Sequence, residues 1–138
     1  MAELNKTVLT LRFFGDDLDP DEITARLGCV PTVGAKKGGA WITKGGTEKV
    51  ARTGFWRLAV KDRQPGDLDA HVTELLTLCS DDLSVWADLT ARFAADIFCG
   101  VFMEESNEGT TLSAETMKKM GLRNLPLDLD IYGRTSSD

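Results

Sequence analysis

The chain has 138 residues, the length of one ordinary domain, and a formal net charge of −6. This charge argues against a nucleic-acid binder and against a membrane-surface protein, because both classes need Lys and Arg to neutralise phosphate groups. With 42% hydrophobic and 28% charged residues, the chain is expected to bury a full core without a metal or a disulfide.

A strand followed by a helix is predicted near the N-terminus. Residues 7–14 read TVLTLRFF, which is rich in β-formers. The helix is predicted to begin after Asp19, a good N-cap residue, with Glu22 completing a box-like capping pattern. Gly28 is expected to end this helix, because glycine readily adopts the left-handed conformation found there.

The glycine-rich segment that follows is harder to interpret. Residues 30–33 can form a short edge strand, and residues 36–46 are predicted to be a long loop or a loose hairpin. Glycine with lysine can cradle phosphate, but no phosphate-binding fingerprint is present, so a mobile loop is the preferred interpretation. Trp41 in this segment is a candidate partner-binding anchor, although it can equally fold back on the core.

The middle of the chain predicts a strand and two helices. Residues 52–61 form the strand, and residues 67–79 form a helix with apolar side chains at helical spacing. Residues 80–82 look like a break and a new N-cap. A second helix is expected to follow, with Trp86 and Leu89 on its buried side.

The C-terminal part predicts strand, helix and strand. Residues 95–103 form a long central strand, in which Gly100 suggests a bulge or a close approach by another group. Ser113 is expected to cap a helix that runs through Met120. Residues 125–132 form the last strand, because apolar and acidic residues alternate there.

These elements predict a single α+β domain over residues 1–133, with residues 134–138 as a disordered tail. The expected architecture is an antiparallel or mixed sheet of four to five strands with helices mainly on one face. A ferredoxin-like or related α/β sandwich is the fold that this pattern favours.

The cysteines favour a reducing compartment, the cytoplasm. Cys29, Cys79 and Cys99 are odd in number, form no CxxC pair and follow no signal peptide, which argues against a disulfide framework or a zinc site. Cys79 and Cys99 lie in apolar runs and are interpreted as core thiols. No apolar run reaches the length of a membrane-spanning helix.

Several short motifs occur together in a fixed order: FFGDDLDP at 13–20, LG at 27–28, PT at 31–32, RTGFW at 52–56, DAH at 69–71, FCG at 98–100, NEG at 107–109 and DIY at 130–132. In this order they resemble the bacterial family catalogued as domain of unknown function 4279. The resemblance covers nearly the whole chain. It implies a small stand-alone bacterial protein, and it supplies neither an activity nor any site residue.

Polar residues on the predicted strands define a candidate ligand site. Alternation places Arg12, Arg57, Asp128 and Asp130 each on one face of its strand, with Tyr132 at the rim. If these faces coincide, two guanidinium groups meet two carboxylates across neighbouring strands. This set is either a pocket for a small ligand or a cross-strand salt-bridge ladder on a solvated face, and the ladder is the preferred interpretation.

Two acidic loops and one histidine are weaker candidates. Residues 16–19 and 104–108 could supply oxygen ligands to Mg²⁺ or Ca²⁺ if the strand ends that carry them are adjacent. Helix capping and solvated turns explain the same residues, so no metal and no cofactor is predicted. His71 is expected to pack against or cap its own helix, because no nucleophile in a recognisable context accompanies it.

No catalytic motif is recognisable, so the sequence leans away from an enzyme. The expected function is a small non-enzymatic bacterial binding protein that acts on a protein partner, for example an immunity-type or regulatory protein. The alternative is a small-molecule-binding protein or an enzyme that uses the polar sheet face with Arg12, Arg57, Asp128 and Asp130. The sequence leaves the oligomeric state open.

Overall fold

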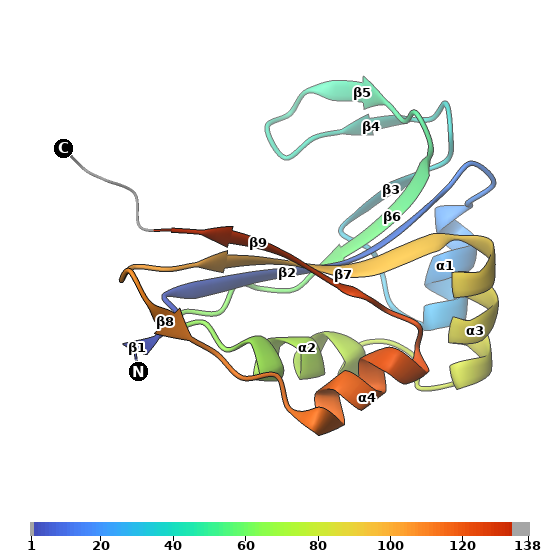
Figure 1. The fold of residues 1–138 in the computed structure, drawn as a ribbon. Coiled ribbons are helices and arrows are strands. Elements are labelled where there is room, and N and C mark those ends of the chain that lie inside the picture. The colour runs from blue at the N-terminus through green and yellow to red at the C-terminus, as the bar shows by residue number, and fades with distance from the viewer. Residues whose placement is uncertain (1, 134–138) are drawn as a thin grey trace.

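The computed structural model describes residues 2–133, which form a two-layer α/β sandwich with a five-stranded sheet and four helices (Figure 1). The strands lie in the order β3 (Val33–Ala35), β6 (Gly54–Ala59), β2 (Lys6–Gly15), β7 (Ala94–Phe102) and β9 (Leu127–Tyr132). Neighbours are antiparallel except β7 and β9, which are parallel. The predicted α+β class with a mixed sheet is confirmed, whereas the expected tail at 134–138 lies outside the described residues.

The four helices of the described part are α1 (Pro20–Leu27), α2 (Leu68–Thr77), α3 (Leu83–Arg92) and α4 (Ala114–Leu122), and they cover one face of the sheet (Figure 1). As predicted, Asp19 caps α1 by accepting a hydrogen bond from the backbone N–H of Asp21 at 3.0 Å. Gly28 ends α1 with a left-handed φ of 73°. Asp67, Asp82 and Ser113 cap the other three helices in the same way.

The predicted end of the last helix at Met120 is wrong. The helix α4 continues through Gly121 to Leu122, and the left-handed residue that follows is Asn124, with a φ of 56°. Asn tolerates this conformation better than most residues with a side chain. The helix therefore has no need of Gly121 as its terminating residue.

Alternation along the strands builds the core between the sheet and the helices. Leu9, Leu11 and Phe13 of β2 all point into it and are fully buried. Phe13 lies in an aromatic cluster, with ring centroids 5.8 Å from Trp56 and 6.2 Å from Trp86. The predicted buried position of Trp86 is confirmed, and Trp56 is a core residue as well, since neither exposes any surface.

The glycine-rich segment forms a hairpin of β4 (Ala40–Ile42) and β5 (Glu48–Val50), one of the two forms expected for it. The hairpin lies over the sheet face that the helices leave open (Figure 1). Trp41 folds back from it onto the sheet, with its ring centroid 5.0 Å from that of Phe55. A further short parallel pair, β1 (Ala2–Glu3) with β8 (Glu108–Gly109), lies near the N-terminus.

His71 is a buried structural link. Its Nε2 lies 2.9 Å from the carbonyl oxygen of Lys61, and its Nδ1 lies 2.9 Å from Oγ1 of Thr7. Because a carbonyl only accepts, Nε2 carries the proton and Nδ1 accepts from the Thr7 hydroxyl. Burial lowers the pKa of His71, which favours this neutral form. The side chain packs as expected, but its hydrogen bonds join α2 to other segments and do not cap its own helix.

Within residues 2–133, none of the helices combines the length and the apolar character needed to cross a membrane.

Candidate functional site

The open face of the sheet carries the polar residues that alternation predicts there. Arg12 of β2 lies directly opposite Arg57 of β6 and directly opposite Asp96 of β7. Asp128 and Asp130 of β9 lie opposite Phe98 and Gly100 of β7. The predicted residues therefore share one face, and together with Asp96 they form a row across the four neighbouring strands β6, β2, β7 and β9.

Arg12 is held by two carboxylates of this row. Its Nε and Nη2 donate to the two oxygens of Asp96 at 2.8 and 2.6 Å, a bidentate pair. Asp128 lies 3.8 Å from the same guanidinium group. The guanidinium also stacks over the ring of Phe98, at 4.6 Å from its centroid. Arg12 is thus held by Asp96, Asp128 and Phe98.

The two carboxyl groups beside Arg12 titrate differently. Burial opposes ionisation of Asp96, but hydrogen bonds from Arg12 and Asp128 outweigh it and lower the pKa of Asp96. The pKa of Asp128 is raised, first by its hydrogen bond to Asp96 and then by the charge of Asp96. Asp128 is 58% exposed, so this pair is a partly solvated ladder.

Asp130 and Tyr132 continue the row at the sheet edge. The hydroxyl of Tyr132 donates to Asp130 at 3.2 Å, and the Tyr132 ring stacks on Phe102 with centroids 4.8 Å apart. The charge of Asp130 raises the pKa of Tyr132. Both side chains are exposed, at the edge of the sheet.

Asp96 is the residue of this row that sequence reasoning missed. The predicted strand 95–103 contains Asp96. The apolar residues that follow it are continuous, and this run was interpreted as a strand buried on both faces, which leaves no place for a polar face. Strict alternation would have found it, because Ile97, Cys99 and Val101 are buried on the helix side and Asp96 falls on the other side.

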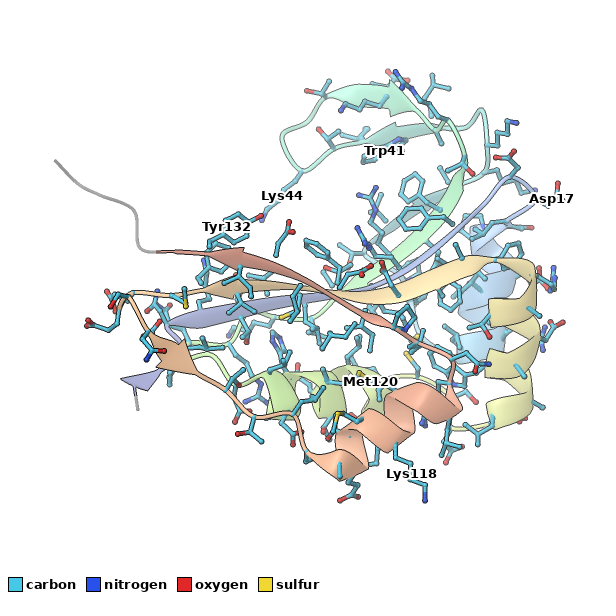
Figure 2. All side chains as sticks on the ribbon, in the orientation of Figure 1. Asp17, Trp41, Lys44, Lys118, Met120 and Tyr132 are labelled. Carbon is cyan, nitrogen blue, oxygen red and sulfur yellow. The ribbon has the colours of Figure 1, made fainter. Side chains whose placement is uncertain are left out.

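A separate cleft lies between the hairpin and the open face, with a volume of about 470 Å³. Figure 2 shows Trp41 on the hairpin, on the side of the hairpin that faces the sheet. The lining combines aromatic rings with cationic and small side chains from β2, β4, β5, β6 and the segment before β6: Phe14, Trp41, Lys49, Val50, Ala51, Arg52, Thr53, Phe55 and Arg57. Three of these residues are cationic and none is acidic.

Arg57 is the charged group at the base of this cleft. Its guanidinium carbon lies 4.7 Å from the centroid of Phe55 and 5.6 Å from that of Trp41. Burial, and then repulsion from Arg12, lowers the pKa of Arg57. Its buried Nε has no hydrogen-bond partner among residues 2–133. The structure thus separates Arg57 from the acidic residues with which it was grouped and pairs it with Trp41.

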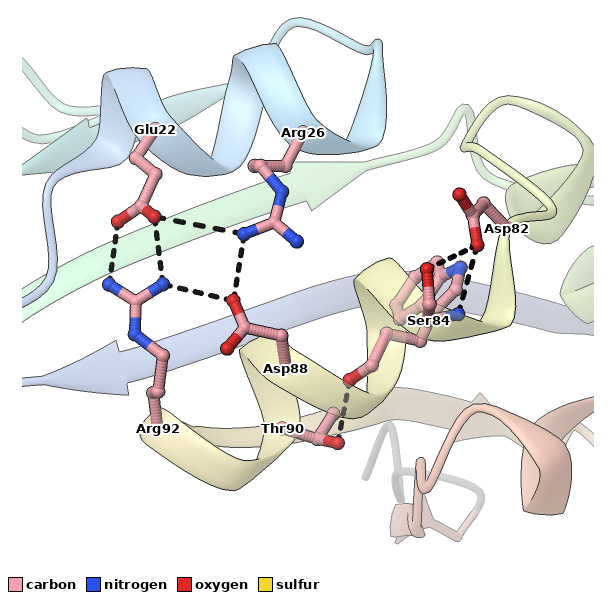
Figure 3. Close-up of polar contacts among 8 residues, drawn as sticks. Glu22, Arg26, Asp82, Ser84, Asp88, Thr90 and Arg92 are labelled. Atoms are coloured by element: carbon pink, nitrogen blue, oxygen red, sulfur yellow. Dashed lines mark hydrogen bonds and ion pairs between the residues drawn. The ribbon is translucent and has the colours of Figure 1, made fainter.

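Other arginines of the fold show what Arg57 lacks. On the outer surface of α1 and α3, Arg92 makes a bidentate pair with Glu22 at 2.7 and 2.8 Å, and Arg26 donates to Asp88 at 2.7 Å (Figure 3). Arg57 has no carboxylate within 4.0 Å in the part of the chain that the structure describes.

A larger hollow of about 830 Å³ lies beside the Gln64–Pro65 segment. Its lining mixes charges of both signs, and Arg63 there is already paired with Glu74 at 3.1 Å. This hollow therefore differs from the cleft at Arg57, where all charged lining residues are cationic.

The two acidic loops do not meet. Since β2 and β7 are antiparallel, with Lys6 opposite Phe102, the loop after β2 and the loop after β7 lie at opposite ends of the sheet. Asp16 instead accepts hydrogen bonds from Thr53 at 2.8 Å and Lys37 at 3.3 Å. No group of three metal-binding side chains gathers anywhere in residues 2–133.

Comparison with known proteins gives one match. A family model described as "Domain of unknown function (DUF4279)" matches residues 5–134, nearly the whole chain. No curated protein and no solved structure matches.

Proposed function

We propose that this chain, which belongs to the DUF4279 family, is a non-enzymatic binding protein that holds a small organic anion in the cleft beneath the β4–β5 hairpin. The observation that carries the proposal is Arg57, a cation at the base of an aromatic cleft with no carboxylate partner in the described residues. Arg57 is partly buried, and a partly desolvated charge without a partner carries a cost that an anionic ligand would offset.

The cleft also defines the chemistry of the ligand. Lys49, Arg52 and Arg57 surround it without an acidic residue, in a protein whose net charge is −6. Local positive charge on an acidic protein selects for anions. Trp41 and Phe55 provide flat apolar walls. The ligand class that fits is therefore a carboxylate, sulfonate or phosphate joined to a flat apolar group.

The planar guanidinium of Arg57 suits this role better than an ammonium group would. It is already stacked against two aromatic rings, which holds its fork of donors in one orientation. A carboxylate or phosphate can accept two hydrogen bonds from such a fork.

A fluorescent probe tests the proposal. We expect 8-anilinonaphthalene-1-sulfonate to bind one site per chain, with energy transfer from tryptophan, and Arg57→Gln to weaken this binding. A hydrogen bond to a charged group contributes about 1.5–3 kcal/mol, which corresponds to roughly a tenfold to a hundredfold loss of affinity. A fluorescence titration measures the effect.

Two controls make the test specific. Lys118→Gln removes one positive charge from α4, on the far side of the molecule from the cleft (Figure 2), and should leave the affinity unchanged. N-phenyl-1-naphthylamine, the uncharged counterpart of the probe, should bind more weakly than the sulfonate and should not respond to Arg57→Gln. Equal binding of both probes would contradict the proposal.

A protein partner is the second candidate function, and the exposed edge of β9 favours it. β9 pairs with β7 on one side and is the outermost strand of the sheet. Leu129 and Ile131 on this strand are 45% and 60% exposed, and Asp128 and Asp130 alternate with them on the other face. An extended segment of a partner, alternating basic and apolar residues, would complement this edge. Two copies of β9 would instead bring their aspartates together.

A short peptide tests this second candidate. We expect the blocked hexapeptide Lys-Val-Lys-Ile-Lys-Val to shift the backbone amide signals of β9 in an NMR titration. Asp130→Lys should weaken binding about fivefold, the effect of roughly 1 kcal/mol from one cross-strand charge pair. The peptide with Glu in place of Lys is the control. Equal binding of the acidic peptide, or shifts confined to another surface, would remove this candidate.

We further propose that the binding takes place in the reducing cytoplasm of a bacterium. The free thiols of Cys29, Cys79 and Cys99 support this location, because a reducing compartment preserves them.

A further inference from the structure

Two cysteines that are 50 positions apart in sequence meet on the helix side of the sheet. The sulfurs of Cys29 and Cys79 lie 3.3 Å apart. Cys29 directly follows Gly28 at the end of α1, and Cys79 follows the last turn of α2. The backbone N–H of Ser80 donates to the carbonyl of Leu27 at 2.8 Å, which ties the two helix ends together. The fold itself therefore holds the two thiols next to each other.

The two thiols differ in access and in acidity. Cys29 is partly exposed, whereas Cys79 is buried. The hydrogen bond from the Cys79 thiol lowers the pKa of Cys29, and the same contact, followed by burial, raises the pKa of Cys79. Cys29 is thus the member of the pair that ionises first and that a reagent in water can reach.

A buried cation stands beside this pair. Arg123 is only 9% exposed and lines the same hollow as Cys79, with a volume of about 400 Å³. Its Nε has no hydrogen-bond partner in residues 2–133. Its charge favours the ionised form of Cys79, but the hydrogen bond to Cys29 and burial outweigh this effect and raise the pKa of Cys79. Oxidation of a cysteine follows its thiolate character and its exposure, and Cys29 exceeds Cys79 in both.

We propose that Cys29 and Cys79 form a reversible dithiol–disulfide couple that hydroperoxides oxidise. The Cys29 thiolate attacks one peroxide oxygen, the O–O bond breaks, and the other oxygen leaves as water or an alcohol after taking a proton. Cys29 is then a sulfenic acid. The Cys79 sulfur attacks the Cys29 sulfur, the S–S bond forms, the S–O bond breaks, and the hydroxyl leaves as water with the proton of Cys79. The two sulfurs lose two electrons and the peroxide gains them, and a small dithiol reverses the change.

This couple goes beyond the anion-binding function and is independent of it. The cysteines lie among the helices, on the opposite side of the sheet from the cleft that contains Arg57. Bond formation needs only the approach of two sulfurs already in contact, without a change in the strands. Oxidation is therefore expected to leave the affinity for the anionic probe unchanged, so the two proposals succeed or fail separately.

Mass spectrometry of the full chain tests the couple. After treatment with hydrogen peroxide at a level that oxidises free glutathione, we expect the intact mass to fall by about 2 Da, the loss of two hydrogens. The number of reactive thiols in the unfolded protein should fall from three to one. Peptide mapping should find Cys29 joined to Cys79, and dithiothreitol should restore the original mass.

Matched variants assign the roles. Cys99→Ser should retain the loss of mass, because Cys99 lies elsewhere in the core. Cys79→Ser should stop the reaction at the Cys29 sulfenic acid, which dimedone traps as an adduct. Three thiols remaining in the treated wild type, or a disulfide peptide that contains Cys99, would overturn the proposal. If a variant does not fold, the intact mass and the thiol count of the treated wild-type protein decide the proposal alone.

Discussion

Phe13→Ala is expected to lower the free energy of unfolding by about 3–5 kcal/mol, the range for removing a buried aromatic ring. Phe13 exposes no surface and lies between two tryptophans, in edge contact with Trp56 at 5.8 Å and stacked with Trp86 at 6.2 Å. Trp56 belongs to β6 and Trp86 to α3, so this one ring joins the sheet to the helix layer. Its removal would leave a cavity with rigid walls.

Urea denaturation followed by tryptophan fluorescence measures this loss. The free energy of unfolding of an ordinary domain is about 5–15 kcal/mol, so the variant would lose a large part of its stability. Phe102→Ala is the matched control, because Phe102 lies on the open face, where its ring contacts exposed Tyr132 and the ammonium group of Lys6. It should lose less than half as much stability. A similar loss in both variants would show that the aromatic cluster is not the centre of the core.

Local signals in the sequence predicted most of the fold. The N-cap at Asp19 and the left-handed Gly28 mark the two ends of α1, and both act within a few residues of their own position. Alternation in β2 placed Arg12 on the face opposite the core for the same reason. One exception was the end of α4, which was expected at Met120, whereas the helix runs to Leu122 and the chain turns at Asn124.

The candidate sites depend on contacts that local signals do not encode. Alternation puts Arg57 on one face, but only the strand order places it next to Arg12 and away from Asp128. The cleft exists because the β4–β5 hairpin folds back and places Trp41 over Phe55. The glycine-rich composition of this segment did not decide between a loop and a hairpin, so it could not predict this contact. The contact of Cys29 with Cys79 likewise arises from two helix ends tied together across 50 positions.

The glycines give the second large stability effect, and identical substitutions should act in opposite directions. Gly54→Ala is expected to cost about 3 kcal/mol, the upper part of the range for overpacking. A Cβ at Gly54 would lie 2.6 Å from the carbonyl oxygen of Gly15 and 2.8 Å from that of Leu18. Both are backbone atoms, and Gly15 pairs directly with Gly54 in the sheet, so neither oxygen can rotate away. The start of β6 would have to move.

Gly121→Ala is the matched control, and its effect should have the opposite sign. Gly121 lies inside α4, where no atom is within 4 Å of an added Cβ. Alanine there should raise the free energy of unfolding by about 0.5–1 kcal/mol, because it restricts the unfolded chain and favours the helix. Thermal or urea unfolding of the two variants against the wild type measures both changes. If Gly54→Ala were as stable as Gly121→Ala, the close contact of β6 with the turn after β2 would be wrong. The position of the first residues of β6, the strand that carries Arg57, would then be wrong as well.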